Sequence, residues 1–166
     1  MKAFARAAAA VFVCCISAFA IPGPALAGSS DAAILKPIHQ FTDGFNAGSA
    51  NTALQAVSPD GSVVIDEFAP HVWQGKTAIA DWMNEWDMDA QDRGITGAKV
   101  TLGDPLRVQS DGKTAYVVLP VTYDYMEKGV AMHEDATMTC TLSKASGTWL
   151  INGWSWNGQV PVKAAP

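Results

Sequence analysis

A stretch near the middle of the chain, residues 62–86, constrains the fold most because it combines two strand signals, a turn and the start of a helix. Val63–Ile65 is a β-branched run, which suits a half-buried strand. Ala69-Pro70 predicts a tight turn that leads into a second short strand at Val72-Trp73. The stretch therefore predicts a pair of strands, and it places one acid, Asp66, at the end of the apolar run.

A helix is expected directly after Gly75. Ile79, Met83, Trp86 and Ala90 recur at three- and four-residue spacing, and acidic residues fall off that face. This spacing is typical of an amphipathic helix with one apolar side. We therefore expect a strand pair that feeds a helix, with the helix covering one face of a sheet.

The first 27 residues predict a secretory signal peptide that is not part of the fold. A positively charged start is followed by the apolar run Ala7–Ala20 and by the small-residue cleavage signal Ala25–Ala27. The alternative is a membrane anchor, but the run is short of the roughly 20 residues that a span needs. We expect cleavage after about Ala27, a periplasmic or extracellular location, and no membrane span in the mature chain.

Residues 28–160 are long enough for one domain with one core, and residues 161–166 are expected to form a flexible tail. Without Lys2 and Arg6, nine basic residues stand against 16 acidic ones, a formal charge of −7. An acidic domain without a basic cluster repels phosphate groups, so we expect no nucleic-acid partner. Cys140 is the one cysteine after residue 27, which excludes an internal disulfide.

The order of the remaining signals is helices first, then long strands. Amphipathic spacing of residues 34, 38, 41 and 45 predicts a first helix that has Ser30 or Asp31 as its N-cap and stops at Gly48, with Pro37 confined to its first turn. A second, short helix is expected over residues 51–57. Strand patterns separated by turn residues follow at 98–102, 106–109, 114–126, 130–142 and 148–156. This order predicts an α+β domain with helices on one face of a curved, mostly antiparallel sheet.

Alternation within residues 130–142 predicts which side chains face the core. The outward face should carry three threonines, Thr137, Thr139 and Thr141. The same parity brings Glu134 onto the apolar face and turns His133 and Asp135 outward. In residues 148–156, alternation alone does not decide which side chains point inward.

Two stretches, VVIDEFAPHVWQGKTAIADW and TCTLSKASGTWLINGWSW, together with the order of elements, resemble the SnoaL-like and ketosteroid-isomerase-like branch of the nuclear-transport-factor-2-like superfamily. The resemblance covers essentially all of residues 28–160. It implies a cone of three N-terminal helices on a strongly curved sheet that encloses an apolar pocket. Members include isomerases, cyclases, dehydratases and proteins that only bind or dimerise, so the resemblance is more specific for fold than for reaction.

The resemblance also implies roles for individual residues. Asp66 falls where the ketosteroid isomerases keep their proton-transferring aspartate. The tyrosine that donates to the enolate oxygen in those enzymes corresponds to Phe41, and their protonated aspartic acid corresponds to Met138. Neither replacement can donate a hydrogen bond, so only the base of that mechanism is retained.

On this basis we predict Asp66 as the acid/base group, with Tyr123 or Tyr125 as donors to a developing oxyanion. Burial among aromatic rings would disfavour the charged form of Asp66 and raise its pKa. A predicted set of pocket-lining residues would bind the substrate: Trp73, Glu134, Met138, Asn152, Trp154 and Trp156.

Each candidate also has a structural interpretation. Asp66 could cap the turn at residues 68–71 by accepting backbone N–H bonds. We favour Glu134 at the sheet edge with its carboxylate in water, because unpaired buried carboxylates are rare. We likewise favour His71 as an exposed turn residue. The tyrosines and tryptophans could be ordinary core residues with satisfied polar tips.

Other kinds of site are not expected. The three histidines, at positions 39, 71 and 133, have no metal-binding spacing, and Cys140 has no basic partner near it in sequence. We expect no metal and no cofactor. Two functions remain open: a small-molecule enzyme acting through Asp66 on a hydrophobic compound, or a noncatalytic binding module that dimerises through the outward threonine face. In either case a homodimer is expected.

Overall fold

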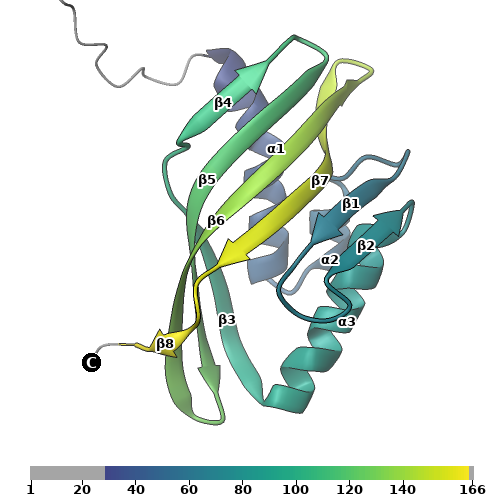
Figure 1. The fold of residues 1–166 in the computed structure, drawn as a ribbon. Coiled ribbons are helices and arrows are strands. Elements are labelled where there is room, and N and C mark those ends of the chain that lie inside the picture. The colour runs from purple at the N-terminus through teal and green to yellow at the C-terminus, as the bar shows by residue number, and fades with distance from the viewer. Residues whose placement is uncertain (1–28, 165–166) are drawn as a thin grey trace, which may run out of the picture.

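The computed structural model describes residues 29–164, so the predicted signal peptide lies outside the described residues. Within this range, helices α1 (Ser29–Asn46), α2 (Ala50–Leu54) and α3 (Ala78–Arg93) pack against one side of a curved sheet (Figure 1). This arrangement confirms the predicted α+β class. None of the helices in residues 29–164 is long and apolar enough to cross a membrane.

The sheet is open and mixed. Its strands are β1 (Ser62–Ile65), β2 (Val72–Gly75), β3 (Ile95–Leu102), β4 (Arg107–Ser110), β5 (Thr114–Glu127), β6 (Val130–Ala145), β7 (Thr148–Gly158) and β8 (Val162–Lys163). The order is β2-β1-β7-β6-β5-β3, with β4 paired to β5 and β8 paired to β6. The β1–β7 pair is parallel and the other pairs are antiparallel. The sheet is therefore mostly antiparallel, as expected.

Helix α1 begins at Ser29, close to the predicted N-cap, and Pro37 lies in its interior. The expectation that Pro37 lies in the first turn was wrong. A proline in a helix interior removes a backbone hydrogen bond and costs about 3 kcal/mol. Ile34, Ile38 and Phe41 on the same helix are each at most 4% exposed. Burying each such side chain contributes about 1.5–3 kcal/mol, so packing against the sheet outweighs the cost of the proline.

The end of α1 is fixed to the sheet and to α2. Asn46 donates from Nδ2 to the Val100 carbonyl and accepts from the Val100 N–H, both at 2.8 Å. On the other side, a Cβ on Gly44 would lie 2.5 Å from the backbone nitrogen of Ala53 in α2. The glycine therefore permits the two helices to cross in contact. These attachments hold the aromatic residues of α1 over the sheet.

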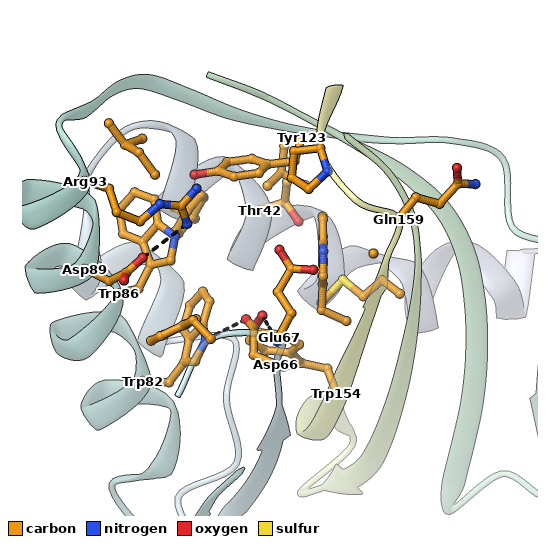
Figure 2. Close-up of a pocket in the computed structure, with 18 of the residues that line it drawn as sticks. Thr42, Asp66, Glu67, Trp82, Trp86, Asp89, Arg93, Tyr123, Trp154 and Gln159 are labelled. Carbon is orange, nitrogen blue, oxygen red and sulfur yellow. Dashed lines mark hydrogen bonds and ion pairs between the residues drawn. The ribbon is translucent and has the colours of Figure 1, made fainter. Parts of the chain in front are cut away.

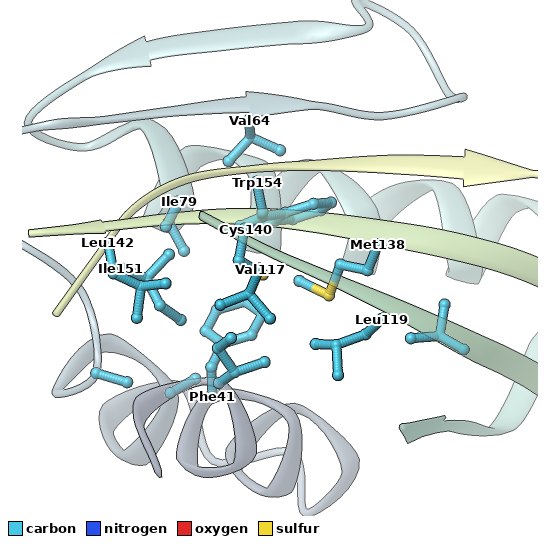
Figure 3. Packing of buried hydrophobic residues seen from close by; sticks show 14 of the residues in the cluster. Phe41, Val64, Ile79, Val117, Leu119, Met138, Cys140, Leu142, Ile151 and Trp154 are labelled. Atoms are coloured by element: carbon cyan, nitrogen blue, oxygen red, sulfur yellow. The ribbon is translucent and has the colours of Figure 1, made fainter. Parts of the chain in front are cut away.

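The inner face of β6 follows the predicted alternation. Its side chains from Glu134 to Leu142 are buried at every second position, while Thr137, Thr139 and Thr141 lie on the opposite face. Figure 3 shows Cys140 and Met138 in the layer between the sheet and Phe41 of α1. The same parity turns His133 outward, where its Nδ1 lies 2.6 Å from Asp124 Oδ1.

Strand β7 contains a β-bulge, which the sequence pattern did not reveal. Leu142 pairs with Ile151 and Thr141 pairs with Gly153, so Asn152 is the extra residue. As a result Ile151 is buried before the bulge and Trp154 is buried after it. In β7, odd-numbered residues point inward before the bulge and even-numbered residues point inward after it. Alternation alone therefore could not assign the inner face of this strand.

The segment predicted to be a tail includes strand β8. Val162 pairs with His133 and Lys163 pairs with Met132, at one end of β6. The Gln159 N–H also donates to the Asp135 carbonyl at 2.9 Å. These bonds hold residues 159–163 against β6, so the loop between β7 and β8 has a defined place beside the sheet.

Candidate active site

A cavity of about 360 Å³ lies between α1, α3 and the inner face of the sheet. This volume is at the lower end of the roughly 300–1,000 Å³ that is common for small-molecule sites. Eight of its 20 lining residues are aromatic: Phe41, Phe45, Phe68, Trp82, Trp86, Tyr123, Trp154 and Trp156. Four charged side chains also line it: Asp66, Glu67, Asp89 and Arg93. The cavity therefore combines an apolar body with a few polar groups (Figure 2).

Asp66 lies just beyond the end of β1, with its carboxylate at the cavity. Its Oδ2 accepts a hydrogen bond from Trp82 Nε1 at 2.8 Å, and its Oδ1 accepts one from the Glu67 N–H at 2.6 Å. Burial raises the pKa of Asp66 to about 6, although both hydrogen bonds act in the opposite direction. Asp66 thus lines the cavity, and the backbone N–H that it holds belongs to Glu67, just before the turn at residues 68–71.

Tyr123 supplies a hydroxyl without a protein partner. Its ring lines the cavity and stacks on Tyr125 with centroids 4.7 Å apart. Its hydroxyl is buried and makes no hydrogen bond within the described residues. Burial raises the pKa of this hydroxyl, and the indole of Trp86 partly offsets that rise. The hydroxyl thus stays protonated and can donate to a ligand oxygen.

Tyr125 has a different role from the one predicted. It is buried but does not line the cavity, and its hydroxyl accepts a hydrogen bond from Arg93 Nη2 at 3.3 Å. Arg93 also pairs with Glu127 at 3.2 Å and with Asp89 at 3.4 Å. Tyr125 therefore helps to anchor the last turn of α3, and the charge of Arg93 is balanced by two carboxylates.

The predicted binding residues fall into two groups. Met138, Trp154 and Trp156 line the cavity, whereas Trp73 and Asn152 do not. Trp73 packs against Phe68 and donates from Nε1 to Glu85 Oε2 at 3.0 Å, so it supports the wall from behind. Asn152 is the bulged residue of β7. The bulge therefore removes Asn152 from the face that carries Trp154 and Trp156.

Glu134 is only 1% exposed, so the favoured placement of its carboxylate in water was wrong. Its Oε1 accepts a hydrogen bond from Trp156 Nε1 at 2.7 Å, a partner supplied by the neighbouring strand. Burial raises the pKa of Glu134, and the nearby acids Glu67 and Asp66 raise it further. Glu134 itself does not line the cavity but lies directly behind Trp156, which does.

Several lining residues were not predicted from the sequence. Trp82 had a usable signal, because it stands three residues after Ile79 and four before Trp86 on the apolar face of α3. Glu67 and Arg93 had none, since each reaches the cavity only through the path of the backbone at the end of an element. Residues 159–161 also line the cavity, although they bordered the predicted tail.

The two positions where the resemblance implied missing donors both lie at this cavity. Phe41 and Met138 each line it, and each presents an apolar side chain. Figure 2 places Tyr123 and Arg93 at one end of the cavity and Asp66, Trp82 and Trp154 at the other. Two of the lining residues described carry a hydroxyl, Thr42 and Tyr123, and Tyr123 is the one at the end of the cavity opposite Asp66.

Comparisons with solved structures agree with this architecture. Hexachlorocyclohexane dehydrochlorinase LinA-type3 from Novosphingobium barchaimii aligns with a TM-score of 0.68 at 14% identity, covering 82% of this chain and 91% of that one. A ketosteroid isomerase-like protein from Erwinia carotovora gives 0.60 at 17%, covering 78% and 96%. A scytalone dehydratase-like protein from Novosphingobium aromaticivorans gives 0.66 at 10%, covering 82% and 89%.

The chain therefore has the nuclear-transport-factor-2-like fold. The solved structures that share this fold include a ketosteroid isomerase-like protein, so the fold is the one that the resemblance implied. No protein-family model matches the sequence, and no curated protein matches it. At these low identities the comparisons define the fold and leave the reaction to be argued from the site.

Proposed function

We propose that the protein binds a small, largely apolar ring compound in this cavity and transfers a proton to or from it through Asp66. The observation that carries the proposal is the carboxylate of Asp66 in an aromatic cavity, with its pKa raised to about 6. A base of this strength accepts protons better than an ordinary aspartate, yet it remains ionised at neutral pH. Tyr123 would hydrogen-bond the oxygen on which negative charge develops.

The neighbouring structures carry names that support this class of chemistry. They include an isomerase-like protein, a dehydratase-like protein and a dehydrochlorinase. Isomerisations and eliminations of this kind share one step, the removal of a proton from carbon by a base. A single carboxylate beside an apolar ring-sized space provides the main requirement for that step.

The direct test is deuterium exchange into 2-tetralone, a small bicyclic ketone with acidic protons next to its carbonyl. In deuterated water, the wild type should exchange these protons about 10²-fold or more faster than Asp66→Asn. The wild-type rate should rise with pH through about 6, because Asp66 must be ionised to act as the base. Equal rates in the two proteins would contradict the assignment of Asp66.

A noncatalytic binding and dimerisation module is the second candidate function. The observation in its favour is the outer face of the sheet, which the helices leave uncovered and which presents the threonines of β6 (Figure 1). Binding of 2-tetralone to wild type and Asp66→Asn with equal affinity, without exchange in either, would favour this alternative. Tryptophan fluorescence can follow the binding, because four of the cavity residues are tryptophans.

We also propose that the protein acts outside the cytoplasm, in the periplasm or beyond it. The support is the charged start, apolar run and small-residue cleavage signal of the first 27 residues. Expression of the full chain in a bacterium, followed by intact-mass measurement of the exported protein, should give a chain that begins at about Gly28. A full-length cytoplasmic product would contradict this proposal.

A further inference from the structure

Two glutamates come close together beside the group already assigned as the base: one lines the cavity, and the other lies behind Trp156. Glu67 follows Asp66 in the turn after β1 and lines the cavity, and Glu134 projects inward from β6. We propose that Glu67 and Glu134 share one proton in the ligand-free protein, and that this proton is the acid that complements Asp66. The shared proton stands on geometry alone, whereas its use as an acid rests on the proposed function.

The surroundings of Glu134 leave one of its oxygens without a donor. Trp156 Nε1 satisfies Oε1 at 2.7 Å, but Oε2 is buried and has no hydrogen-bond partner within the described residues. An ionised carboxylate in this position would leave an unpaired charge in an apolar layer, which is strongly unfavourable. A proton on one of the two glutamates removes that unpaired charge and allows a hydrogen bond between the two carboxyl groups.

Gly158, at the end of β7, shows how close the two carboxyl groups come. A Cβ placed on Gly158 would lie 2.5 Å from Glu67 Oε2 and 2.9 Å from Glu134 Cδ, and it would overlap Glu134 Oε1. Both carboxyl groups therefore occupy the space that any side chain at this position would need. The glycine is required here by that space, since its backbone is not among the left-handed glycines.

The other titratable groups around the pair favour retention of the proton. Besides Glu67 itself, the acid Asp66 acts on Glu134 from the turn after β1. Tyr123 and Tyr125 face it from β5, where Tyr123 is its cross-strand partner. The cation that lines the cavity, Arg93, is engaged with Asp89 and Glu127. Two carboxyl groups in contact cannot both ionise freely, so they retain one proton.

This arrangement suits the elimination of water from a cyclic β-hydroxy ketone. Asp66 takes the proton next to the carbonyl, and the electrons of the broken C–H bond form the new C=C bond. The C–O bond breaks, and the leaving hydroxyl takes the shared proton and departs as water. Asp66 is then protonated and the pair is not, so one transfer from Asp66 to the neighbouring pair restores both. The carboxylate of Asp66 acts electrostatically on Glu134, and that of Glu67 acts on both, so the three acids lie near one another.

The experiment is carbon-13 NMR of protein labelled at the glutamate side-chain carboxyl carbons, titrated without ligand. The chain has four glutamates to resolve: Glu67, Glu85, Glu127 and Glu134. The pair should release its protons in two steps separated by about 2–3 pH units, with both signals responding to both steps. Glu134→Gln should abolish the upper step, and the control Glu85→Gln should leave it in place.

Glu67→Gln provides the decisive second variant, because Glu67 is exposed and its substitution leaves the core intact. An upper step that persists at the same pH in Glu67→Gln would show that the proton is not shared, and would overturn the inference. A single acidic step for every glutamate would overturn it as well. The NMR titration could show a shared proton while deuterium exchange into 2-tetralone does not depend on Asp66. That combination would refute the proposed function, and the inference that the two glutamates share a proton would remain.

Discussion

Asp66 is held by two hydrogen bonds that favour its charged form, and its pKa is nevertheless raised from 3.8 to about 6. A rise of that size corresponds to about 3 kcal/mol against the ionised carboxylate in the folded protein. Desolvation by the surrounding rings of α3 and β7 is therefore the dominant influence. If Asp66 only capped the turn, its hydrogen bonds would outweigh desolvation and its pKa would be lowered.

Asp66→Asn tests this balance through stability. Because the folded pKa is above the unfolded value, the stability that protonated Asp66 contributes is complete below pH about 4 and is lost as pH rises through about 6. Between pH 4 and pH 8, the free energy of unfolding of Asp66→Asn should therefore increasingly exceed that of the wild type, by up to about 3 kcal/mol. Urea unfolding across that range measures the difference. Parallel curves for the two proteins would mean that burial does not control this group.

Tyr123→Phe separates binding from stability. Since the Tyr123 hydroxyl makes no hydrogen bond within residues 29–164, its removal should leave the free energy of unfolding unchanged or raise it by about 1 kcal/mol. The affinity for 2-tetralone should fall roughly tenfold through loss of one hydrogen bond. Tyr125→Phe is the matched control, because the Tyr125 hydroxyl accepts a hydrogen bond from Arg93. This substitution should lower the free energy of unfolding and leave the affinity for 2-tetralone unchanged. The reverse pattern would transfer the donor role to Tyr125.

For single residues, the sequence predicted Asp66, Tyr123 and three further residues that line the cavity. These predictions were possible because strand parity and the family resemblance both depend on residues that are close together in the chain. The burial of Glu134 could not be predicted in the same way. Its partners come from other segments: Trp156 is 22 residues away along the chain, and Glu67 belongs to a turn after a different strand. A rule about average carboxylates cannot anticipate partners that tertiary structure brings together.

Among the elements, α1 and β7 depart most from a simple pattern. Helix α1 retains Pro37 in its interior because its buried face contributes more than the proline costs. Strand β7 changes parity at Asn152, which adds Trp154 and Trp156 to the cavity. The positions of the helices and long strands were predictable from periodicity. The bulge was not, because no glycine or proline at Asn152 itself marks the change of register.

Gly44→Ala tests the contact between α1 and α2. Alanine is favoured over glycine in a helix by up to about 1 kcal/mol, but here its Cβ would meet the backbone of Ala53 at 2.5 Å. We expect the contact to dominate, with a net destabilisation of about 1–3 kcal/mol in thermal or urea unfolding. Ala53→Gly in the same chain should not rescue it, because the nearest atom is backbone. A stabilised Gly44→Ala protein would contradict the close crossing.

For the molecule as a whole, the helices cover one face of the sheet and leave the other uncovered (Figure 1). One row of side chains crosses that outer face by strand register, from Ile65 through Ser155 and Thr139 to Val118. Ile65 is 48% exposed, these four residues carry no charge, and the row ends at Arg107 on β4, which pairs with Val118. An uncharged stretch in the middle of the outer face suits contact with a second copy, as the predicted homodimer requires.

Sedimentation velocity of residues 28–166 tests that expectation. The wild type should sediment as a dimer, and Thr139→Arg should sediment as a monomer because it places two like charges near the symmetry axis. Thr52→Arg, on exposed α2, is the control and should remain dimeric. A wild type that is monomeric at every concentration would remove the dimer from both candidate functions.

Gly158 also has a consequence for evolution. If the space above its backbone is filled by two carboxyl groups, then positions 67, 134 and 158 form one unit under selection. A lineage that replaces either glutamate with a shorter residue becomes free to accept a side chain at 158, whereas a lineage that keeps both must keep the glycine. Correlated substitution at these three positions among relatives would therefore record, across natural sequences, where the acid pair has been retained and where it has been lost.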